Sequence, residues 1–171
     1  MDQINAILER EEELLETLLF KLVAVRLLLE SGELRFLSRA TREVERARTR
    51  TREVDLVRAT TVAQHETGTT LRDLATGAPE PWPGILRDHH DLLAGLVAEI
   101  EVTAHRNSLL ARSGLEALRP ARVPSTVPEL PADAIRTDDE ELERLARGAS
   151  FDAVLGTASK LRMPDLLDFL R

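Results

Sequence analysis

Residues 14–29, LLETLLFKLVAVRLLL, form the most apolar stretch of the chain, with twelve apolar residues among sixteen. Glu16, Lys21 and Arg26 interrupt it, and it is shorter than the roughly 20 residues that cross a bilayer. A helix that is apolar on nearly every side has to be covered on nearly every side. The stretch therefore predicts a helix that packs within a helical assembly and needs more than one partner.

We expect the first helix, which contains this apolar stretch, over residues 2–31. Its apolar residues recur at mixed three- and four-residue spacing, and Gly32 is a typical C-terminal stop. The stripe consists of Ile4, Leu8, Leu15, Leu18, Leu22, Val25 and Leu29.

Two more long helices are expected, over residues 33–65 and 83–118. The first of these has one narrow apolar stripe among many Arg and Glu residues, and the second opens with Pro83, which suits a first helical position. Between them, Thr70 is expected to cap a short helical turn and Trp82 to close the end of the core. The two stripes are Leu37, Val44, Ala47, Val54, Val57 and Thr61, and Leu86, Leu93, Leu96, Val97, Ile100, Ala104, Ala111 and Leu118.

The pattern predicts an all-α fold, because no segment alternates apolar and polar residues as a strand does. Three long helices joined by short turns predict an antiparallel bundle over residues 1–119. Residues 120–137 contain four of the chain's eight prolines and predict an extended linker. Residues 138–171 then form a helical tail.

The tail is expected to consist of short amphipathic helices. Asp138 and Asp139 cap the first, Ser150 caps the second, and Pro164 opens the last. Such short helices cannot bury their own apolar faces, so we expect them to dock in a groove. The expected anchors are Phe151, Val154, Leu155, Leu161, Met163, Leu166, Leu167, Phe169 and Leu170.

The first helix supplies most of the expected groove. Two neighbouring helices cover only part of it, which leaves apolar residues such as Phe20 and Leu27 for a further partner. An apolar groove of this kind suits an amphipathic helix, although a tighter bundle or a homodimer would hide the same patch. The expected groove residues are Leu15, Leu19, Leu22, Val23, Leu93, Val97 and Ile100.

Composition argues against several function classes. A formal net charge of −7 disfavours non-specific nucleic-acid binding, and the absence of cysteine removes disulfides and thiolate chemistry. His89 and His90 are adjacent and cannot share one helix face, so no metal site is expected. No phosphate loop or nucleophile motif is present, and no secretory signal is visible at the start. We expect a cytoplasmic protein without enzymatic activity, cofactor or membrane insertion.

Several motifs carry a family resemblance over residues 1–118. LLFKL at 18–22, RFLSRATREVE at 35–45 and APEPW at 78–82, in this order, resemble the FlgN family of flagellar export chaperones in its actinobacterial form. The resemblance implies a chaperone of the flagellar type III export system. It would bind the C-terminal helices of the hook–filament junction proteins FlgK and FlgL, keep them unassembled and deliver them to the export gate.

The tail departs from that family. Its ending, ASFDAVLGTASKLRMPDLLDFLR at 149–171, resembles the extreme C-terminus of FlgL, the segment that such a chaperone binds. Either the chain is an engineered fusion of chaperone and cargo peptide, or the chaperone carries its own pseudo-substrate. The competing hypotheses are a coiled-coil homo-oligomer with a domain-swapped tail and a membrane-surface protein. The even charge balance of the tail disfavours the membrane hypothesis.

Overall fold

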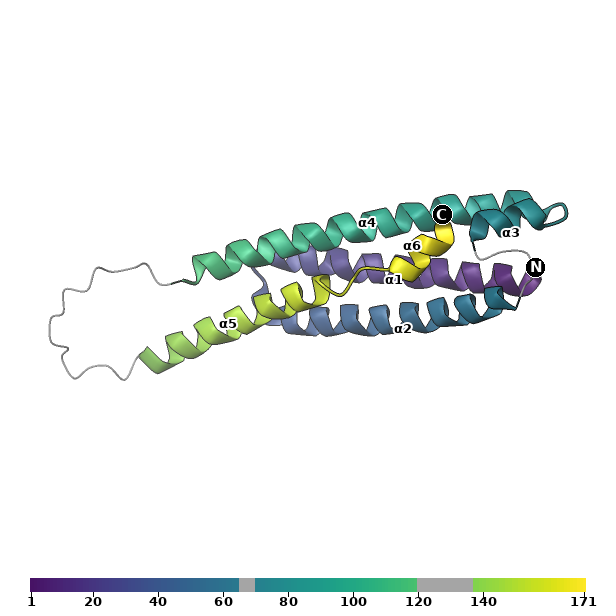
Figure 1. Ribbon diagram of the computed structural model, residues 1–171. Coiled ribbons are helices and arrows are strands. Elements are labelled where there is room, and N and C mark those ends of the chain that lie inside the picture. Colours follow the sequence, from purple (N-terminus) through teal and green to yellow (C-terminus); the bar gives the residue numbers. More distant parts are fainter. Residues whose placement is uncertain (65–69, 120–136) are drawn as a thin grey trace.

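The computed structural model describes residues 1–64, 70–119 and 137–171 (Figure 1). Every regular element within these residues is helical, which confirms the all-α fold class. In chain order the elements are α1 (Asp2–Ser31), η1 (Leu34–Phe36), α2 (Leu37–Ala63), α3 (Leu71–Gly77), α4 (Trp82–Ala117), α5 (Thr137–Ala158) and α6 (Pro164–Leu170).

The long helix α1 packs lengthwise against both α2 and α4 (Figure 1). α2 runs antiparallel to α1, and α4 starts at the end of the molecule where α2 finishes, so α4 and α1 run in the same direction. α5 packs against both α4 and α2, and α6 continues from it toward α3. The C-terminal segment, defined here as α5 and α6 with the residues between them, therefore lies between α2 and α4 on one side of the molecule.

Local sequence signals set several of the helix ends. α1 stops at Gly32, whose backbone has the left-handed conformation, φ 73°, that glycine adopts without steric cost. The amide of Glu33 then donates to the carbonyl of Leu28 at 3.0 Å, which completes the C-terminal cap. At the start of α3 the hydroxyl of Thr70 accepts from the amide of Asp73 at 3.1 Å, as the sequence predicts.

The second predicted helix differs from the structure at both ends and in its buried stripe. It begins with the short 3-10 helix η1, and α2 ends at Ala63, while His65 lies outside the described residues. Val57 was expected in the stripe but is 50% exposed, and its neighbour Arg58 is buried in its place. Residues 57 and 58 point about 100° apart, so the rotation of α2 about its axis decides which of them is covered.

The C-terminal segment corrects a second prediction. Ser150 does not cap a helix, because α5 runs without a break from Thr137 to Ala158. The Ser150 hydroxyl instead donates to the carbonyl of Ala146 at 3.0 Å, one helical turn earlier. The predicted linker lies outside the described residues apart from Thr137, which begins α5.

One hydrophobic core joins the long helices and the C-terminal segment. The predicted stripes of α1 and α4 are buried in it, except that Leu29 and Leu118 are only half-buried, as is Trp82 at the start of α4. The C-terminal segment contributes Phe151, Val154, Leu161, Leu166, Phe169 and Leu170 to the same core. Among the described residues, no helix is long and apolar enough to cross a membrane.

Candidate functional site

The candidate site is the groove between α2 and α4 that the C-terminal segment fills. At the C-terminal end of α5, side chains of four helices enclose a residual cavity of only about 10 Å³, about the space of one water molecule. This end of α5 is therefore packed into the core and is not laid loosely on its surface. The lining residues are Leu22 and Val25 of α1, Thr41 and Val44 of α2, Asn107 of α4, and Val154, Thr157 and Ala158 of α5.

The predicted groove residues fall into two groups. Leu19 and Val23 are half-buried, and the remaining five are fully buried. Those five are Leu15, Leu22, Leu93, Val97 and Ile100.

The predicted tail anchors also divide. Leu155 and Met163 are half-buried, and Leu167 is 39% exposed. The remaining six, Phe151, Val154, Leu161, Leu166, Phe169 and Leu170, are buried.

Phe20 and Leu27 are not covered by the C-terminal segment. They are 66% and 55% exposed, although the sequence predicts that the uncovered face of this helix receives the partner. Phe20 lies five residues, or about 140° around the helix, from the fully buried Leu15. The face of α1 that carries Leu15 and Leu22 is therefore buried in the core, and the face of Phe20 and Leu27 points to solvent.

Phe151 of α5 packs against the backbone of α4 at Gly114. A Cβ atom added to Gly114 would lie 2.6 Å from Cε1 of the Phe151 ring, well inside van der Waals contact. Only glycine at position 114 leaves room for the ring in this position. The contact makes Gly114 part of the groove, although glycine inside a helix carries no apolar signal that a sequence pattern could reveal.

Two polar contacts set the register of α5 along α2. The hydroxyls of Ser38 and Ser150 lie 3.2 Å apart, and the Thr157 hydroxyl hydrogen-bonds the Glu45 carboxylate. Seven residues, two helical turns, separate the contacts on each helix, as expected of helices packed in parallel. Ser150 and Thr157 are buried, so a shift of register would cost them these partners.

The carboxylate of Glu45 responds to the C-terminal segment. Its partial burial raises the pKa, but the hydrogen bonds from Thr157 and Arg48 and the charges of Arg48 and Lys160 outweigh the burial and hold the pKa below its usual value. Thr157 and Lys160 both belong to the docked segment. The docked segment therefore supplies two of the four effects that lower the pKa of Glu45.

A buried ionic cluster lies beneath α6. Arg58 of α2 is 3% exposed, and its Nε lies 3.0 Å from Oε2 of Glu11 on α1. Its Nη2 pairs with Asp55, one turn earlier on α2. The Phe169 ring of α6 covers the guanidinium, with 4.1 Å between Cζ and the ring centroid. One aromatic residue of the C-terminal segment thus closes a charged site that α1 and α2 form together.

Glu11 is the most perturbed acid in the described part of the chain. Burial raises its pKa from 4.5 to about 7, and the charge and hydrogen bond of Arg58 oppose this rise without cancelling it. Desolvation prevails because the carboxylate is fully buried while Arg58 is shared with Asp55.

The two adjacent histidines point to different neighbours, as the sequence predicts. His89 faces α1, where Nδ1 pairs with Glu12 and Nε2 lies 2.9 Å from Oδ1 of Asn5. His90 donates from Nε2 to the carbonyl of Leu170 at 3.0 Å and so holds the end of α6. In the residues that the structure describes, no group of three or more potential ligands could hold a metal ion.

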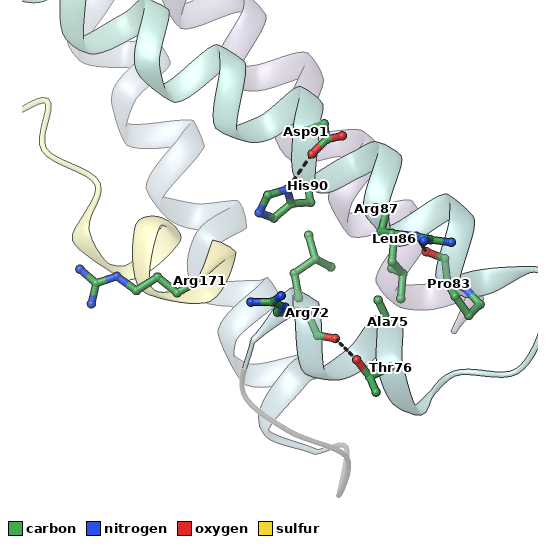
Figure 2. A pocket seen from close by; sticks show the side chains of 10 residues that line it. Arg72, Ala75, Thr76, Pro83, Leu86, Arg87, His90, Asp91 and Arg171 are labelled. Carbon is green, nitrogen blue, oxygen red and sulfur yellow. Dashed lines mark hydrogen bonds and ion pairs between the residues drawn. The ribbon is translucent and has the colours of Figure 1, made fainter.

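A half-open hollow of about 630 Å³ lies beyond His90, between α3 and α4. Figure 2 shows His90 and Arg72 directed toward it, whereas Arg171 extends away from α3 and α4. Nε of Arg87 is engaged by the carbonyl of Pro83 at 2.9 Å. The hollow lies next to the place where His90 holds the end of α6.

The sequence pattern indicates most of the apolar residues that are buried along this groove, but it does not indicate the polar contacts. Ser38, Glu45, Arg58 and His90 all contact the C-terminal segment but stand in stretches that read as solvated helix surface. The partners of Arg58 show why. Glu11 is 47 residues away in sequence, so no local pattern connects the two.

The Phe151–Gly114 contact predicts that replacing this helical glycine by alanine lowers the stability of the chain. Alanine is the better helix former by about 1 kcal/mol, so Gly95→Ala, on an exposed part of α4 with nothing near its added Cβ, should be neutral or stabilising. Gly114→Ala should instead destabilise the chain by about 1–3 kcal/mol through the clash with Phe151. Urea unfolding of the full chain measures both. A Gly114→Ala variant as stable as Gly95→Ala would contradict this packing.

The raised pKa of Glu11 predicts how stability varies with pH. Between pH 4.5 and about 7 the Glu11 carboxyl is protonated in the native state but ionised in the unfolded state. The contribution of this protonation to the free energy of unfolding is therefore complete below pH 4.5 and is lost as the pH rises through 7. Glu11→Gln should remove about 1–3 kcal/mol of the change in the free energy of unfolding between pH 5 and pH 8, as measured by urea unfolding. Glu16→Gln, on the exposed side of α1, should keep the wild-type slope. Equal slopes in all three proteins would show that Glu11 titrates normally.

Comparison with known proteins leaves the groove as the main evidence on function. No family model matches the chain, and no curated protein or solved structure matches it. The resemblance to FlgN chaperones and to the FlgL terminus therefore remains a prediction from the sequence motifs.

Proposed function

We propose that the chain is a chaperone of the flagellar type III export system that binds the C-terminal helices of FlgK and FlgL. In this proposal, α1, α2 and α4 form a three-helix receiving bundle, and the C-terminal segment occupies its groove as a cargo-like segment in cis. The chaperone keeps its cargo unassembled in the cytoplasm and presents it to the export gate. Its action is binding, without catalysis or a cofactor.

One observation carries the proposal: an amphipathic helical segment buries its apolar face against three other helices. Leu22 of α1, Val44 of α2 and Asn107 of α4 line the same small cavity as Val154 of α5. This is the helix-in-groove mode by which many proteins bind peptides. A chaperone for assembly-prone helices needs such a surface, because it has to cover their apolar faces until they are released.

The division of contacts also fits reversible binding of a helix. Apolar burial supplies most of the free energy, at about 1.5–3 kcal/mol for each fully buried large side chain. Each polar contact contributes only about 0.5–1.5 kcal/mol but fixes the position of the bound helix. The Ser38–Ser150 and Glu45–Thr157 contacts have this second role for α5.

The alternative is a structural homo-oligomer that exchanges the segment between copies. A segment docked in cis or in trans would make the same contacts, so the test has to follow the segment after its covalent link is cut. Placing the recognition sequence of a specific protease within residues 120–136 of the full chain makes this possible. Cutting after folding avoids any assumption that the bundle folds alone.

We predict that the cut protein stays associated and that a fluorescent peptide of residues 138–171 exchanges into it reversibly. The remaining bundle should keep its helical circular dichroism signal while the segment is exchanged. Peptides of the FlgK and FlgL C-terminal helices should compete with the labelled peptide, and a scrambled peptide of equal composition should not.

Three outcomes would count against the proposal. Unfolding of the bundle when the segment leaves would make the segment a permanent part of the fold. Mass exchange between isotopically labelled copies of the uncut chain, with a dimer on size-exclusion chromatography, would favour the domain-swapped oligomer. Reversible binding of the native segment without any competition from FlgK or FlgL peptides would remove the junction proteins as cargo.

A further inference from the structure

We propose that Arg58 is a specificity-determining residue of the groove, which selects an aromatic side chain at the position that Phe169 occupies. This inference rests on the proposed function, since it concerns what the groove accepts. It adds a requirement that apolar burial alone does not impose. Leucine, isoleucine and phenylalanine all suit an apolar groove, but only an aromatic ring also suits the flat face of a guanidinium ion.

The geometry of Arg58 presents one face of its guanidinium to α6. The N–H groups of a guanidinium lie in its plane, and here Nε and Nη2 are directed at the carboxylates of Glu11 and Asp55. The faces of the ion have no hydrogen-bonding capacity. Phe169 covers one of them, with its ring centroid 4.1 Å from Cζ, well within cation–π range.

Burial makes this contact selective. Arg58 is 3% exposed and Phe169 is 4% exposed, so a docked helix removes water from the guanidinium. A ring compensates for the lost hydration through its negative π-face, whereas an aliphatic side chain only displaces the water. Two carboxylates hold the guanidinium in place, so it cannot turn to find a different partner. The site should therefore reject helices that have an aliphatic residue at this position.

The second aromatic residue of the segment provides a matched control. Phe151 is buried to a similar degree, at 6% exposure, but packs against Gly114, where contact is decided by shape alone. The two rings thus separate electrostatic from steric recognition within one segment. A change that alters only the charge distribution of a ring should matter at position 169 and not at position 151.

The test uses the cut full-length protein and fluorescent 138–171 peptides that differ in one ring. Pentafluorophenylalanine is close in shape to phenylalanine but has the opposite charge distribution across its face. Replacing Phe169 by it should weaken binding to the cut protein about tenfold or more, and should weaken binding to the cut Arg58→Lys protein by no more than about twofold. Equal effects in the two proteins would overturn the proposal, since the ring would then be read by shape.

A double-mutant cycle tests the role of Arg58 itself in the intact chain. Arg58→Lys keeps the charge but loses the planar face, so it should reduce the effect of Phe169→Leu on amide exchange in α6 from about tenfold to about twofold. Phe151→Leu should have the same effect with or without the Arg58→Lys substitution. An effect of Phe169→Leu that is unchanged in the Arg58→Lys background would overturn the proposal. If no peptide binds the cut protein at all, the proposed function fails, and this cycle still reports on the contact.

Discussion

The covering of α1 is the constraint on which the rest of the structure depends. Its apolar residues extend around too much of the helix for one neighbour to cover, so α2 and α4 both pack along it. The C-terminal segment then closes the side between those two helices, where Leu22 lines the same small cavity as Val154 of α5. Apolar area removed from water stabilises the fold by roughly 25 cal/mol per Å². The long helices and the C-terminal segment therefore share one core.

The groove combines two kinds of recognition that differ in what they discriminate. Apolar contacts supply affinity, but they accept many sequences, because aliphatic side chains of similar volume can replace one another with modest repacking. The hydroxyl pair of Ser38 and Ser150, the Glu45–Thr157 bond and the Arg58–Phe169 stack demand particular groups at particular positions. They lie at successive points along the C-terminal segment, so a slipped register loses all of them together.

The ionic cluster beneath the groove has an energetic cost, which agrees with a role in selecting particular groups and not in supplying affinity. Glu11, Asp55 and Arg58 give up hydration when the groove is filled, and a buried ion pair adds little net stability compared with apolar residues of the same size. The contribution of the cluster is instead to orient the Arg58 guanidinium. Two carboxylates fix the guanidinium so that its face meets the docked helix, and the raised pKa of Glu11 records the desolvation that this arrangement requires.

Local sequence signals are enough to predict the all-helical fold, the stop at Gly32, the cap at Thr70 and the apolar faces of α1 and α4, because each depends on residues within a few turns of one another. The burial of Arg58 and the exposure of Val57 depend on how the helices pack, since a rotation of about 100° separates the two residues and the partner Glu11 lies 47 residues away. Tertiary packing also places the Ser150 hydroxyl, within the unbroken helix α5, 3.2 Å from that of Ser38, 112 residues distant. Contacts between such remote residues are set by how whole helices pack, and no local pattern records them.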